Sequence, residues 1–85
     1  MLPVVESLLK KDLANKDPKV GLVINLDHDY ITIAITNHKG TVEFVEWKQF
    51  FDEGVKRVVC DAAGNFVSEH HFKDLVWEEV LELVI

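Results

Sequence analysis

The feature that most constrains the fold is a pair of alternating segments joined by a short polar turn. Apolar residues occupy every second position of 20–26 and of 30–36, as Val20, Leu22, Ile24 and Leu26 and then Ile31, Ile33 and Ile35. Alternation with a period of two is typical of strands that bury one face. Only residues 27–29 separate the segments, and parallel neighbours would need a crossover of about a dozen residues. We therefore expect an antiparallel hairpin.

Two further hairpin signals follow. Residues 37–40 form a polar turn, and Thr41–Glu46 alternates again, so a third strand extends the hairpin into a meander. Val55–Cys60 is rich in valine, and a loop at 61–65 separates it from the short apolar segment Phe66–Val67. This arrangement predicts a second hairpin.

The chain begins with a helical pattern. Pro3 suits a first-turn position, and apolar residues recur at helical spacing as Val5, Leu8, Leu9 and Leu13. The cluster 15–18 ends in proline, which pushes the residue before it out of helical geometry. We expect the first helix to end near Asn15.

Two later segments also carry helical signals. Trp47, Phe50 and Phe51 share a helical spacing ahead of Gly54, which predicts a short central helix. Ser68 is a suitable N-cap for a closing helix. The apolar face of that helix would consist of Phe72, Leu75, Val76, Val80, Leu83 and Val84.

These elements define an α+β domain that spans residues 1–85, in the order α-β-β-β-(α)-β-β-α. Its antiparallel sheet comprises a three-stranded meander plus a second hairpin, packed against the N- and C-terminal helices. Amphipathic helices need an apolar surface to cover, and the sheet face with the isoleucines supplies one. We expect that face to contain Leu22, Ile24, Ile31, Ile33, Ile35, Val42 and Phe44.

Composition excludes several classes of protein. The 85 residues include one cysteine, Cys60, so an intrachain disulfide or a thiolate zinc cluster cannot form. The apolar runs are far shorter than the roughly 20 residues that cross a bilayer, and Glu6 interrupts any signal-peptide core. We expect a cytoplasmic protein without membrane contact, of the kind typical of small accessory proteins in bacteria and their viruses.

The charge argues against nucleic acid as a partner. The net charge is −6, and all of this negative excess lies in residues 41–85, which contain ten carboxylates and four basic residues. Phosphate binding requires clustered basic side chains, but the only adjacent basic pairs are Lys10-Lys11 and Lys56-Arg57. We expect no nucleic-acid binding.

No motif predicts catalysis, and we expect neither an enzyme nor a cofactor. The spacings HxH, HxxxH and HExxH are absent, as are a GxSxG turn and a phosphate-binding glycine loop. No metal site is expected either. The alternative is a small ligand- or metal-binding protein, whose side chains would be His28, His70, His71 and Cys60.

The second face of the sheet is the expected contact surface. It should contain Val23, Asn25, Tyr30, Thr32, Ala34, Thr36, Glu43 and Val45, a set that is poor in charge and rich in hydroxyl and apolar groups. Surfaces used for association share these properties. Three arrangements stay open: a helix of the chain covers this face, a second copy covers it in a homodimer, or another protein does.

We therefore predict a small non-enzymatic interaction module with an accessory, regulatory or inhibitory role. It would dock onto a protein partner or associate with itself through the second sheet face, an edge strand or the acidic closing helix. The candidate anchors are Tyr30, Thr32, Val45 and Trp47. The carboxylates of the closing helix, Glu78, Glu79 and Glu82, would steer the approach of a partner.

Overall fold

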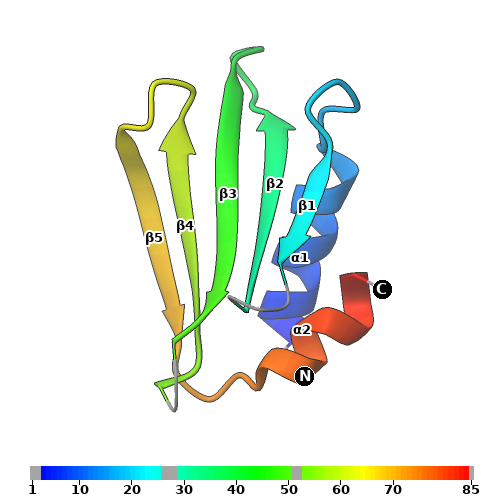
Figure 1. The fold of residues 1–85 in the computed structure, drawn as a ribbon, viewed down its shortest axis with the longest axis vertical. Helices are drawn as coiled ribbons and strands as arrows, with labels where there is room; N and C mark the ends of the chain where they lie inside the picture. Colours follow the sequence, from blue (N-terminus) through cyan, green and yellow to red (C-terminus); the bar gives the residue numbers. More distant parts are fainter. Residues whose placement is uncertain (1–2, 26–28, 51–52, 85) are drawn as a thin grey trace.

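A computed structural model describes residues 3–25, 29–50 and 53–84. It contains two helices and five strands (Figure 1). In chain order they are α1 (Pro3–Ala14), β1 (Leu22–Asn25), β2 (Tyr30–Thr36), β3 (Val42–Gln49), β4 (Val55–Asp61), β5 (Phe66–Phe72) and α2 (Trp77–Val84).

The five strands form one antiparallel sheet in the order β1-β2-β3-β4-β5. The predicted α+β class and the predicted first hairpin are confirmed, since Ile24 pairs with Ile31 and Leu22 with Ile33. Pairing of β3 with β4, which sets Val45 opposite Val59, joins the meander and the second hairpin into a single sheet.

One face of the sheet carries the core. Ile31, Ile33 and Val45 on the strands are fully buried, and Val5 and Leu9 of α1 pack onto them. Helix α1 lies behind β1 and β2 on this face, and α2 packs against α1 near one end of the sheet (Figure 1). We call this the helix side of the sheet and the opposite surface the open face.

The phase predicted for β3 is wrong. Val42 pairs with Thr36, and Phe44 lies between Ala34 and Cys60, so both point to the open face rather than to the core. Glu43 and Val45 lie on the helix side instead, and Val45 is fully buried there.

The predicted short central helix is wrong for its first part, residues 47–49, whereas Glu53 near its end lies in a 3-10 turn in which its N–H donates to Phe50 O at 2.9 Å. Trp47 lies inside β3, which continues to Gln49 and pairs with β4 as far as Val55. Residues 51 and 52, which fall in the predicted helix, lie outside the described residues. Gly54, expected to end that helix, instead precedes β4.

The closing helix begins eight residues later than predicted, at Trp77 instead of Glu69. Ser68 is paired with Val59 inside β5, so it does not cap a helix. The seven residues Phe66–Phe72 form the last strand, and α2 begins only at Trp77. The second hairpin exists, but its second strand continues to Phe72 instead of ending at Val67 as predicted.

Candidate functional site

An apolar row crosses the open face from β2 to β5. The register places Ala34 opposite Phe44, Phe44 opposite Cys60, and Cys60 opposite Phe66. Neighbouring strands lie about 4.8 Å apart, so the four side chains stand next to one another across about 14 Å. We call Ala34, Phe44, Cys60 and Phe66 the apolar row.

Further apolar side chains flank this row. Val42 and Val58 are half-buried on the open face, and the neighbouring Val67 is 49% exposed at a β-bulge beside the row. Phe66 itself is 63% exposed. Exposed apolar side chains gathered on one surface are typical of interaction sites, whereas single exposed ones are common.

The other half of the open face is polar. Lys56 Nζ lies 3.4 Å from Glu69 Oε1 and 4.3 Å from the ring centre of Phe50. His71 Nε2 is 2.6 Å from the carbonyl oxygen of Glu53, and because a carbonyl only accepts, the nitrogen donates. The open face thus combines an apolar half with a charged half.

Two of the four predicted anchors lie on this face. Tyr30 and Thr32 are half-buried there, and the Tyr30 hydroxyl accepts a hydrogen bond of 3.3 Å from Asn25 Nδ2. Val45 and Trp47 are fully buried on the helix side, so they cannot line an accessible surface. Sequence reasoning missed Phe44 and Phe66 as surface residues, and only Phe44 had a signal, its alternation with Val42.

The predicted steering charges lie elsewhere. Glu78, Glu79 and Glu82 belong to α2, whose buried residues Trp77 and Val80 join the core on the helix side. Glu78 and Glu82 are exposed. These carboxylates are not continuous with the apolar row.

A buried ion pair ties α1 to the sheet. Asp12 is 2% exposed and accepts hydrogen bonds from Arg57 Nε at 2.8 Å and Arg57 Nη2 at 2.6 Å. Trp47 Nε1 donates a third bond to the same carboxylate at 2.8 Å. Asp12 follows Val5 and Leu9 at helical spacing, so a carboxylate on the apolar stripe was the signal for this contact.

This ion pair also separates the two basic residues of β4. Adjacent strand residues point to opposite faces, so Lys56 lies on the open face while Arg57 is held inside by Asp12. The two charges therefore do not form one basic patch.

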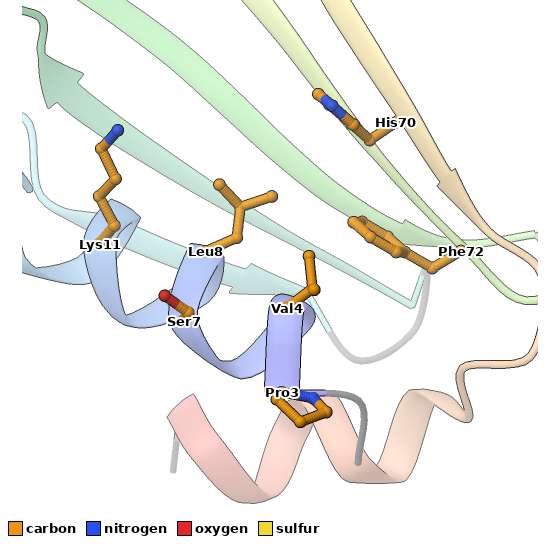
Figure 2. Close-up of a pocket in the computed structure, with 7 residues that line it drawn as sticks. All are labelled: Pro3, Val4, Ser7, Leu8, Lys11, His70 and Phe72. Carbon is orange, nitrogen blue, oxygen red and sulfur yellow. The ribbon is translucent and has the colours of Figure 1, made fainter.

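A groove of about 540 Å³ lies between α1 and β5 on the helix side. Figure 2 shows Val4, Leu8 and Lys11 of α1 facing His70 and Phe72 of β5 across it. The ring of Phe72 stacks on the ring of Trp47, with 5.8 Å between the ring centres, and on the ring of His70, with 6.2 Å between the ring centres. Val4 on the groove wall is 68% exposed.

The side chains of the ligand- or metal-binding alternative do not converge where they can be described. His70 lies on the helix side and His71 on the open face. Cys60 is four positions along β4 from the partner of His71, about 13 Å at strand rise. His28 lies outside the described residues, and within 3–25, 29–50 and 53–84 no three potential ligands form a metal site.

Two further findings bear on function. Within the described part of the chain, neither helix is long and apolar enough to cross a bilayer. No protein-family model, curated protein or solved structure matches the chain, so its function must be inferred from its own geometry.

Proposed function

We propose that this protein is a non-enzymatic interaction module of the cytoplasm that docks onto another protein through its open face. The observation that carries the proposal is the apolar row, in which Phe44, Cys60 and Phe66 stand side by side on a sheet face that neither described helix covers (Figure 1). Burying such a row stabilises a complex by about 25 cal/mol for each Å² of apolar surface removed from water.

The layout of the face supports a protein as the occupant. An interface commonly has an apolar centre with a polar rim, and here Tyr30, Thr32, Lys48 and Glu69 border the apolar half on one side. Phe44 is the expected anchor because neighbours flank it on both sides, and central aromatic residues contribute most to binding in interfaces. Phe66, nearer the edge, would supply the second contact.

Photo-crosslinking in host cells tests this proposal. A photoreactive phenylalanine replaces Phe66 in one variant and exposed Val76, outside the open face, in the control. We expect one dominant adduct from position 66 that position 76 does not give, and we expect Phe44→Ser to abolish it. The purified partner should then bind the parent protein at least about tenfold more tightly than Phe44→Ser. Equal adducts at both positions would contradict the proposal.

A further inference from the structure

We infer that two copies of this chain pair through the outer edge of β5 to form a continuous ten-stranded sheet. The two edges of the sheet differ. β1 has four residues, and short edge strands are one way in which proteins block unwanted pairing. β5 has seven residues, FVSEHHF, and beyond the β-bulge at its start the regular segment 68–72 carries no proline or lysine of the kind that commonly protects a long edge.

The backbone directions of β5 follow from printed hydrogen bonds. Asp61 N donates to Asn65 O at 2.9 Å, so the backbone groups of Asp61, and of every second residue before it in β4, point to β5. Phe50 N donates to Gly54 O at 2.9 Å, which confirms that the alternate positions point to β3.

This alternation determines which groups of β5 are unused within the sheet. Ser68, His70 and Phe72, the partners of Val59, Arg57 and Val55, bond to β4. Glu69 and His71 therefore direct their N–H and C=O groups to the outer edge. No strand among the described residues pairs with that edge.

The β-bulge determines where a second copy can pair. The register shifts between Val59 and Cys60, which disrupts the ladder beside residues 66 and 67 and leaves 68–72 regular. The centre of this regular segment is His70. A twofold axis beside His70, perpendicular to the sheet, sets Glu69 opposite His71 of the second copy and the reverse.

Charge favours this register over its neighbours. The four backbone bonds between Glu69 and His71 would be accompanied by two carboxylate–imidazolium pairs on the open face, in which Nδ1 is the donor because Nε2 of His71 already donates to Glu53 O. An axis beside Glu69 would instead place two carboxylates opposite each other. An axis beside His71 would need Lys73, which lies beyond the end of β5.

The pairing keeps both open faces on one side and all helices on the other, because residue 70 faces the helix side in both copies. The groove between α1 and β5 (Figure 2) then meets its symmetry mate across the axis, with His70 between them. The inference uses the edge of the sheet, whereas the proposed function uses the apolar row, so either can fail alone.

Sedimentation velocity and a cysteine scan test the inference. In a Cys60→Ser background, single cysteines replace Glu69, His70 or His71, and covalent dimer is measured under mild oxidation. Facing residues at a non-hydrogen-bonded pair are close enough for a disulfide, so position 70 should cross-link at least about tenfold faster than the others. The flanking exposed positions control for random collision.

A charge exchange provides the second arm. Glu69→Lys and His71→Glu should each weaken the sedimenting dimer, and the double variant should restore it, while circular dichroism verifies that each is folded. Each change acts twice by symmetry, so the dissociation constant of the dimer should rise about tenfold. A monomer at all concentrations, or cross-linking at 69 or 71 as fast as at 70, would overturn the inference.

Discussion

Replacement of Asp12 by alanine should destabilise the fold by about 3–5 kcal/mol, the usual effect of removing one partner from a buried ion pair. Asp12 accepts hydrogen bonds from Arg57 at 2.8 and 2.6 Å and from Trp47 Nε1 at 2.8 Å. Without it the Arg57 guanidinium, in a residue 8% exposed, keeps its charge in the interior without its partner. The free energy of unfolding of a whole domain is about 5–15 kcal/mol, so this loss is a large fraction of it.

Urea denaturation with fluorescence detection measures this loss, and the same helix offers a matched control. Glu6 and Lys10 form an ion pair of 2.8 Å with side chains 42% and 63% exposed. Glu6→Ala should hardly move the urea midpoint, because solvent screens an exposed pair. Asp12→Ala should lower the midpoint strongly with an unchanged slope.

Equal, small shifts for Asp12→Ala and Glu6→Ala would refute the reasoning, because burial would then add nothing to the ion pair. A large shift has two possible causes, the unpaired charge of Arg57 and the lost hydrogen-bond acceptor of Trp47 Nε1, and a double variant distinguishes them. Asp12→Leu with Arg57→Met removes both charges and should recover part of the loss. The remaining deficit should be about 1–3 kcal/mol, since Trp47 Nε1 would still lack its acceptor.

Three further predictions concern the core, a glycine and a turn. Ile33→Ala should cost about 2–5 kcal/mol in thermal or urea unfolding, because Ile33 is fully buried, and a harmless change would contradict its place in the core. Gly54→Ala should destabilise far more than Gly64→Ala in the same assay: both have positive φ, at +90° and +86°, but only at Gly54 would a Cβ clash with a backbone oxygen, that of Phe72. Hydrogen bonds from the backbone N–H and side chain of Asn65 lower the pKa of Asp61 below its ordinary 3.8, so its carboxylate stabilises the fold above that pH and loses this effect as pH falls through the lower folded pKa. The stability difference between the parent and Asp61→Asn should therefore shift in favour of the variant below about pH 3.8, and a constant difference between about pH 2 and 6 would contradict this.

The class of the fold could be predicted from sequence, but the phase of β3 could not. Its segment VEFVEW offers two apolar alternations, one through Val42 and Phe44 and one through Val45 and Trp47. Local pattern gives each the same weight. The structure chooses the second, in which Trp47 pairs with Ile31 in the register and donates to Asp12 on α1. That contact joins residues 35 positions apart, which no local pattern contains.

The last strand shows the same limit. Ser68 and Glu69 form a valid helix start, and the following apolar residues suit a helix. In the structure, pairing of Phe66–Phe72 with β4 outweighs this local preference, since strand formation depends on the neighbours that a segment meets. The candidate site inherited both errors: Tyr30 and Thr32 were placed on the correct face, whereas Phe44 and Phe66 were missed.

The reactivity of the native thiol in living cells tests the central claim most directly. Cys60 belongs to the apolar row, so a partner that docks there must shield it from a permeant maleimide. Its alkylation should be at least about tenfold slower in host cells than in purified protein, while a control thiol introduced by Ala14→Cys with Cys60→Ser, at the exposed end of α1, should react alike in both. Equal rates for Cys60 inside and outside the cell would contradict the account.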